Sequence, residues 1–253
     1  MKIYIETDME GISGISDKSM IERNDRYALE RLMTDTNAAI RGAFDGGADE
    51  VIVEDGHGGG NNFIKEMLDS RAVQVTHEPV YDCDACFMVG VHAKSGTEHA
   101  FYDHTQSSVS WHGYYINGRA CGEMAQLGAF AGAFGIPIVM VSGDFAACAE
   151  AREFFGNIKT ACVKYGIGHV KAECIPDDEA ERLIYEAARS AMSIIKEVQP
   201  FRVVLPAEIK VEFNRTDYCD AYIERGRKDI ERLDGRTVRR IQNTIEKYSD
   251  ILM

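Results

Sequence analysis

Two carboxylates stand one residue apart near the start of this chain, in the stretch MKIYIETDMEGISG. Asp8 and Glu10 follow the apolar run Ile3 to Ile5, which is typical of a buried strand. On an extended backbone, side chains two residues apart point to the same side. In an open α/β sheet, ligands bind at the carboxyl ends of the strands. The pattern therefore predicts that Asp8 and Glu10 offer two oxygen donors to one ligand.

Imidazole and carboxylate groups also stand at the ends of three later elements. His57 follows the run EVIVE, His92 follows the apolar run ACFMVGV, and Glu123 lies in the first turn of a helix expected near Gly122. In a parallel sheet these positions meet at one edge. Zinc and manganese bind histidine nitrogen together with carboxylate oxygen, whereas calcium and magnesium sites rarely contain two histidines. We therefore predict a site for a first-row transition metal.

The five candidate ligands outnumber the three that a single catalytic zinc usually takes from protein. Two metal ions are therefore the favoured hypothesis, bridged by Asp8 and sharing a water that loses a proton near neutral pH. A group that moves protons is expected beside them, and His104 in the polar segment FYDHTQ is the candidate catalytic residue. His99 lies in a charged stretch and His112 in an aromatic run, where packing is the simpler interpretation.

Alternating apolar runs and helical patterns predict an α/β fold, with a largely parallel sheet flanked by helices. After about residue 160, helical patterns dominate the sequence. We expect a metal-binding α/β catalytic lobe over residues 1–160 and a smaller α+β lobe over residues 161–253. Strands are expected at residues 2–7, 50–54, 73–76, 85–91, 110–118, 136–141, 202–205 and 208–213. Helices are expected at residues 25–45, 62–70 and 177–198, from Gly122 onward, behind residue 144, and through most of the chain after Asp217.

Composition limits the partners and the compartment. The chain has 253 residues, is 45% hydrophobic and carries a net charge of −13. Nucleic acids and anionic membranes are bound through accumulated Lys and Arg, so neither is expected as a partner. No apolar run approaches the roughly 20 residues of a membrane helix, and the first residues lack a signal-peptide pattern. The seven cysteines are an odd number, which indicates reduced thiols and a cytoplasmic protein.

Other motifs allow other interpretations. The sequence HGGG after Gly56 is similar to an esterase oxyanion loop, but the required GxSxG is absent, as is a P-loop. Cys83 and Cys86 form CxxC, yet they precede a strand and have no second pair for zinc. Lys94 and Arg119 lie near the candidate ligands and are able to bind a substrate carboxylate or an oxyanion. Taken singly, each candidate ligand has an ordinary structural interpretation. Their expected position at the same edge of the sheet favours a metal site.

The segments ETDMEGISG, EDGHG, GVHA, DHT and YINGRACGE occur in this order within the first 145 residues, and they resemble the D-aminopeptidase family of zinc peptidases. The resemblance implies an α/β lobe with a smaller second lobe and a ring-like homo-oligomer, a decamer in the best-known member. It also implies hydrolysis of short peptides from a free amino terminus, with a preference for D-residues. By this resemblance His104 is the catalytic histidine, and the ligands of a two-zinc centre are Asp8, Glu10, His57, His92 and Glu123.

The chain departs from the family pattern at the second motif. Where the family has Asn-Asp-Ser-His, this chain has Glu54-Asp55-Gly56-His57, which adds a carboxylate near a candidate ligand and can change the metal preference. Three glycines, Gly58 to Gly60, follow. Two functions of other kinds stay open: a two-metal phosphoesterase or amidase acting on a non-peptide substrate, and a non-catalytic metal-dependent peptide-binding protein.

Overall fold

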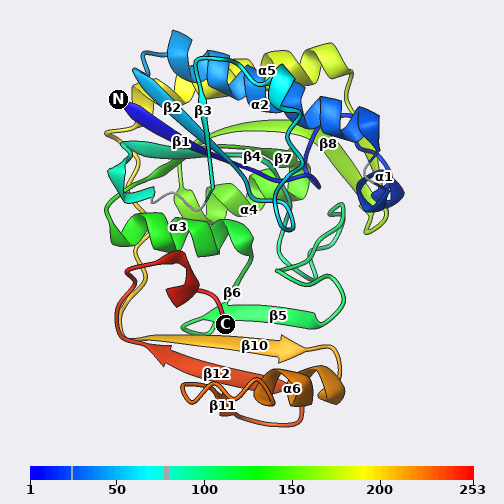
Figure 1. Cartoon of the computed structure of the whole chain (residues 1–253), viewed down its shortest axis with the longest axis vertical. Helices are drawn as coiled ribbons and strands as arrows, with labels where there is room; N and C mark the ends of the chain where they lie inside the picture. Colours follow the sequence, from blue (N-terminus) through cyan, green and yellow to red (C-terminus); the bar gives the residue numbers. More distant parts are fainter. Residues whose placement is uncertain (24, 77–79) are drawn as a thin grey trace.

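The computed structural model describes residues 1–23, 25–76 and 80–253. In these residues the chain forms a large, mostly parallel sheet with helices on both faces and a smaller antiparallel sheet to one side (Figure 1). The predicted α/β class, with a smaller second part, is confirmed. No helix in the described ranges is both long and apolar enough to cross a membrane.

The large sheet changes direction of winding between β1 and β4. Its order is β3-β2-β1-β4-β7-β8-β9, and its neighbouring strands are parallel except β9, which is antiparallel to β8. From β1 the chain builds outward to β2 and β3, then crosses to the other side of β1 to build β4, β7 and β8. The bounds are β1 Lys2–Thr7, β2 Glu50–Asp55, β3 Val73–Val75, β4 Ala85–Val91, β7 Ile138–Asp144, β8 Lys159–Gly168 and β9 Lys171–Cys174.

Two long helices cover each face of this sheet. Figure 1 shows α2 (Arg26–Asp45) and α5 (Asp177–Ala191) on one face, and α3 (Glu123–Ala133) and α4 (Phe145–Phe155) on the other. Both faces are therefore apolar, and β4 and β7 are buried along their whole lengths. The short helix α1 (Lys18–Glu22) follows β1. Where we expected a helix at residues 62–70, only a 3₁₀ turn at Lys65–Met67 forms.

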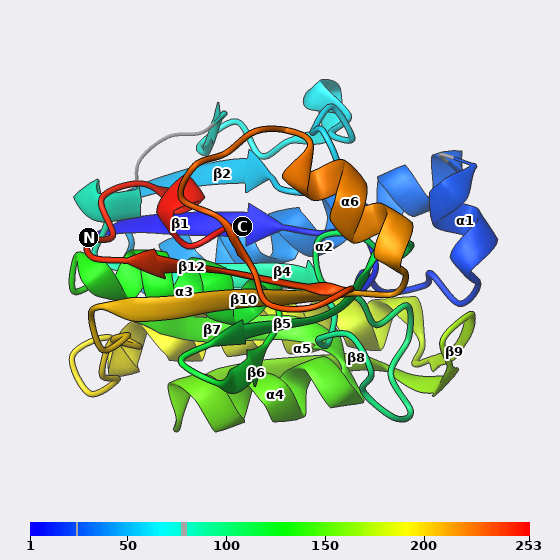
Figure 2. The ribbon, with the colours of Figure 1, turned by 90° about the horizontal axis from the view of Figure 1, so that it is seen from below.

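The smaller sheet collects strands from distant parts of the chain in the order β11-β12-β10-β5-β6. Buried and half-buried residues alternate along β10, so one of its faces packs against the interior. Figure 2 shows this sheet and α6 (Thr216–Ile223) from below, in front of the large sheet. The strand bounds are β5 Trp111–Ile116, β6 Arg119–Cys121, β10 Ala207–Phe213, β11 Glu231–Arg232 and β12 Thr237–Gln242.

Several predictions for the second half of the chain were wrong. The chain after Asp217 contains strands β11 and β12 as well as α6. In TVRRIQ the buried residues are Val238 and Arg240 while Ile241 is exposed, so the strand shows no apolar alternation. Residues 202–205 form no strand, and α5 ends at Ala191 before a 3₁₀ turn. The boundary between two lobes at residue 160 stays a prediction. Each sheet contains strands from both sides of residue 160, because β8 and β9 belong to the large sheet while β5 and β6 belong to the small one.

We predict that Gly42→Val destabilises the fold. A Cβ atom at Gly42 in α2 would lie 2.5 Å from the carbonyl oxygen of Tyr185 and 2.7 Å from Cβ of Ala188, both in α5. The two helices must therefore separate, which costs about 1–3 kcal/mol of the free energy of unfolding. Urea denaturation measures this loss. Gly168→Val is the matched control, because nothing lies within 4 Å of its Cβ position. Equal midpoints for the two variants would contradict the close helix contact.

Candidate metal centre

Three parallel strands end within two residues of one another at the point where the sheet changes direction. Thr7, the last residue of β1, pairs with Asp55 of β2 and with Val89 of β4. Asp8 and Glu10, which follow β1, therefore lie at the same edge of the sheet as His57, which follows β2, and His92, which follows β4. Crevices for ligands form at such switch points, outside the carboxyl ends of the strands.

Two glycines bring the end of β1 against the end of β4. The amide of Gly11 donates to the carbonyl of Gly90 at 2.7 Å, and a Cβ atom at Gly11 would lie 2.1 Å from the carbonyl oxygen of Val91. Gly90 has a φ of +74°, and its Cβ would lie 2.4 Å from the carbonyl oxygen of Asp8. Only glycine fits this contact. The expected extended backbone through Glu10 was wrong, because residues 9–12 form a turn.

The turn nevertheless directs both carboxylates toward one imidazole. Nδ1 of His57 lies 2.9 Å from Oδ1 of Asp8 and 3.1 Å from Oε2 of Glu10. Asp8 presents its other oxygen, Oδ2, to Nε2 of His92 at 3.4 Å. One carboxylate thus faces two different histidines with its two oxygens.

His92 carries a buried nitrogen with no hydrogen-bond partner among the described residues. Its Nδ1 donates to the carbonyl oxygen of Ala93 at 2.9 Å, because a carbonyl can only accept. Within the part of the chain that the structure describes, Nε2 makes no hydrogen bond, and it lies 3.5 Å from Oε1 of Glu123. A ligating histidine usually has this arrangement, with one ring nitrogen held by an oxygen and the other directed at the metal.

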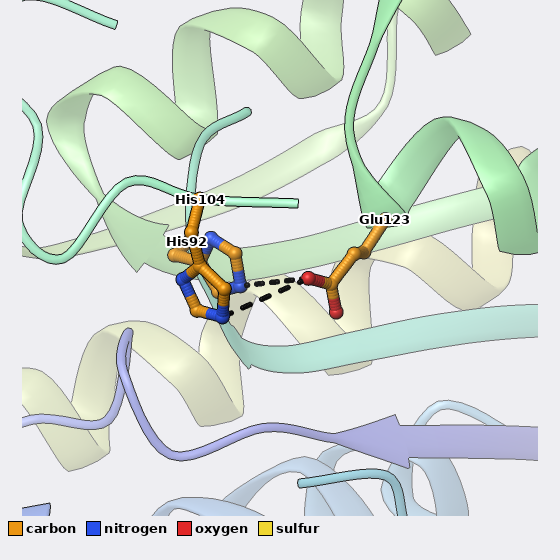
Figure 3. A group of neighbouring side chains, drawn as sticks. All are labelled: His92, His104 and Glu123. Atoms are coloured by element: carbon orange, nitrogen blue, oxygen red, sulfur yellow. Dashed lines mark ion pairs between the residues drawn. The ribbon is translucent and has the colours of Figure 1, made fainter. Parts of the chain in front are cut away.

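His104 repeats the arrangement of His92. Its Nδ1 donates to the carbonyl of Tyr102 at 2.8 Å, and its Nε2 lies 3.8 Å from Oε1 of Glu123. The two imidazoles are stacked, with ring centres 4.1 Å apart and planes 6° from parallel (Figure 3). Glu123 also accepts a hydrogen bond from the amide of Gln106 at 2.7 Å. As predicted, Glu123 is the first residue of α3, and the helix amino terminus favours its negative charge.

The structure therefore brings together all six residues singled out in the sequence. We call them the metal-centre cluster: Asp8, Glu10, His57, His92, His104 and Glu123. Separate ligand atoms of Asp8, Glu10 and His92, and of His92, His104 and Glu123, lie within 4.8 Å of one another. Nitrogen and carboxylate donors at this spacing, with a buried unpartnered Nε2, fit zinc or manganese.

The ionisable groups of the cluster shift one another's pKa values. Burial lowers the pKa of His92, but Glu123, Asp8 and Glu10 outweigh burial and raise it well above its usual value. Burial raises the pKa of Asp8, but the hydrogen bond to His57 and the charge of His92 lower it overall. Burial and the charge of Asp8 raise the pKa of Glu10. The site concentrates negative charge that a cation would neutralise.

Sequence reasoning missed two charged residues beside the cluster. Glu6 lies two residues before Asp8, and with Asp8, His92 and Glu123 it lines a small cavity of about 20 Å³. Burial and the charge of Asp8 raise the pKa of Glu6 well above its usual value. The period-two spacing from Asp8 was a signal that could have found it.

The second missed residue is Lys164 of β8. Its side chain is fully buried, and Nζ donates to the carbonyl oxygens of Glu10 at 2.8 Å and Ile15 at 2.7 Å. Burial lowers its pKa to about 8. Lys164 therefore holds the turn that carries Glu10, and no sequence pattern marked a lysine within an otherwise apolar strand environment.

Other sequence candidates lie apart from the cluster. His99 is exposed next to Glu98, and His112, which we expected to be packed, is exposed on β5. Cys83 and Cys86 are buried free thiols, and burial raises the pKa of Cys83 to about 11, so neither has the character of a reactive thiolate.

Comparison with known proteins agrees with this geometry. A family model described as D-aminopeptidase matches residues 1–253. The chain belongs to the D-aminopeptidase family. A D-aminopeptidase of Bacillus subtilis (strain 168) is 32% identical over 225 residues, which cover 84% of this chain and 81% of that protein. The solved structure of the Zn-dependent D-aminopeptidase DppA from Bacillus subtilis, described as a self-compartmentalizing protease, superposes with a TM-score of 0.92. That match has 27% identity and covers 100% of this chain and 96% of the other.

We predict that zinc binding at the cluster releases protons and strengthens as the pH rises. Burial lowers the pKa of His57, but its hydrogen bonds to Asp8 and Glu10 outweigh burial and raise it to about 11. The metal-free protein therefore holds this imidazole protonated at neutral pH, whereas a metal binds only the neutral ring. Calorimetric titration in buffers of different ionisation enthalpy should show at least one proton released per chain. His57→Gln should release fewer, and an enthalpy independent of the buffer would contradict the prediction.

Proposed function

We propose that this protein is a metal-dependent aminopeptidase that removes residues from the free amino terminus of short peptides, with a preference for D-residues. The observation that carries the proposal is the buried, unpartnered Nε2 of His92, set between the carboxylates of Asp8 and Glu123. Membership of the D-aminopeptidase family supports the substrate class. The Zn-dependent relative supports zinc as the metal.

We infer that each chain binds two zinc ions, with manganese as a possible substitute. In this proposal Asp8 would help to hold both ions, because its two oxygens face His57 and His92 separately. Metals held in this way would supply an activated water. The other four ligands are Glu10, His57, His92 and Glu123.

In the proposed reaction His104 is the general acid and base that transfers a proton to the leaving amine. When bound, zinc supplies Lewis acidity and makes water reactive near neutral pH. The carbonyl of Tyr102 holds Nδ1–H of His104, so Nε2 is the atom that accepts a proton or gives one to the leaving amine. Stacking on His92 fixes the plane of the ring. The hydrogen bond from Gln106 to Glu123 keeps that carboxylate turned toward both histidines.

We further propose a homo-oligomer that encloses its active sites, with a ring and a decamer as the specific form. The self-compartmentalizing relative supports assembly. We also propose that the protein works in the cytoplasm. The seven cysteines are free thiols, a state that a reducing compartment maintains.

The protein should contain about two zinc ions per chain and cleave D-alanyl-D-alanine roughly tenfold or more faster than L-alanyl-L-alanine. Chelation should abolish the activity, and added zinc should restore it. Elemental analysis and a matched dipeptide assay measure both quantities. Metal without cleavage of either isomer would rule out the peptidase proposal, and equal rates on both isomers would rule out the D-preference.

His104→Ala and Asp8→Ala should fail in different ways. Loss of a general acid or base lowers kcat by about 10²–10⁴-fold while the metal content remains, so His104→Ala should retain zinc. Asp8→Ala removes the proposed bridge and should lose both zinc and activity. Metal content and kcat are measured on the same samples, with His99→Ala as a matched exposed-histidine control. Full activity of His104→Ala would disprove its catalytic role.

A further inference from the structure

A second cavity, of about 180 Å³, adjoins the metal-centre cluster. The three segments that carry His92, His104 and Glu123 each continue into its wall. Lys94 comes two residues after His92, Thr105 follows His104, and Cys121 comes two residues before Glu123. Residues 112–115 of β5 also line it. The cavity therefore lies within two residues, along the chain, of three members of the metal-centre cluster.

Lys94 is held in the wall of this cavity by a buried carboxylate. Its backbone amide donates to Oε2 of Glu150 at 2.8 Å, and its Nζ lies 3.4 Å from the same oxygen. Glu150 is 4% exposed, whereas the side chain of Lys94 is 26% exposed. Gly122 leaves room for Lys94 and Glu150 to lie close together, because a Cβ atom at Gly122 would lie 2.9 Å from both Glu150 Oε1 and Lys94 Cβ. The ammonium is thus positioned, with donors remaining, since Lys has three.

The ionisable groups that line the two cavities differ. The small cavity at the metal-centre cluster includes Glu6, Asp8 and Glu123, whereas the described residues lining the larger cavity include Lys94 and no Asp or Glu. Arg119, the other basic candidate, is not in this wall. Its Nη2 binds Oε1 of Glu153 at 3.0 Å, and its guanidinium lies 3.8 Å from the ring of Phe154.

The volume limits what the larger cavity can hold. A cavity of about 150 Å³ accommodates benzene. The larger cavity here, at about 180 Å³, therefore fits one small amino-acid residue. In a dipeptide, the residue after the cleaved bond carries the C-terminal carboxylate. A dipeptide bound with this residue in the cavity would therefore place an anion there.

We propose that Lys94 is a specificity-determining residue that binds the C-terminal carboxylate of dipeptide substrates. This inference rests on the proposed aminopeptidase function. In this proposal the second residue of the dipeptide occupies the larger cavity. The ammonium contacts the carboxylate and takes no part in proton transfer.

The test compares D-alanyl-D-alanine with its C-terminal amide on the zinc-loaded, full-length protein. A charge-assisted contact predicts that kcat/KM for the acid exceeds that for the amide by about 10- to 100-fold. Lys94→Met should remove this ratio through a higher KM for the acid, with the amide unchanged within about twofold. Lys94→Arg should retain part of the ratio. Arg119→Met is the matched control and should keep it in full.

The outcomes separate this proposal from the one on which it rests. Equal cleavage of acid and amide by the wild-type protein overturns the role of Lys94 without any substitution, so the test does not depend on the folding of a variant. Equal losses on both substrates in Lys94→Met also overturn it, because the ammonium would then act on the reaction or on the fold. A wild-type protein that cleaves neither substrate overturns the aminopeptidase function itself.

Discussion

The close backbone contact between Gly11 and Gly90 is the constraint on which the site depends. It joins the turn after β1 to the end of β4, and either glycine would collide with its neighbours if it carried a side chain. The contact occurs where the sheet changes its direction of winding, the place at which open α/β sheets form crevices. The carboxylates of Asp8 and Glu10 reach the histidines because the two backbones touch there.

Gathering negative charge at this point has an electrostatic cost that the surroundings offset. Asp8, Glu10 and Glu123 lie close together, with Glu6 beside them. In the metal-free protein, protonated imidazoles compensate part of this charge, and the buried ammonium of Lys164 lies behind the turn. Such an arrangement is a preformed receptor for cations, because a metal ion replaces protons with a larger positive charge. The same acidic environment accounts for the contrast with the cavity at Lys94.

The sequence predicted the elements with simple patterns and missed those whose stability comes from tertiary contacts. The strands at residues 2–7 and 85–91 each contain a run of apolar residues, and their bounds agree with β1 and β4. Strand β12 is rich in arginine, and its period of two is visible only when one face is known to be buried. Four residues of the metal-centre cluster, Asp8, Glu10, His57 and His92, were recognisable because they follow the ends of strands, and Glu123 because it begins a helix. Lys164 was not, because its partners are backbone carbonyls from a distant turn.

The position of Lys164 in the chain has a consequence for the order in which the protein assembles during synthesis. All six side chains of the metal-centre cluster precede residue 124, whereas Lys164 belongs to β8. The candidate ligands therefore leave the ribosome before the residue that anchors the carbonyls of Glu10 and Ile15. Until β8 has joined the sheet beside β7, a nascent chain holds this turn without the two hydrogen bonds that Lys164 donates.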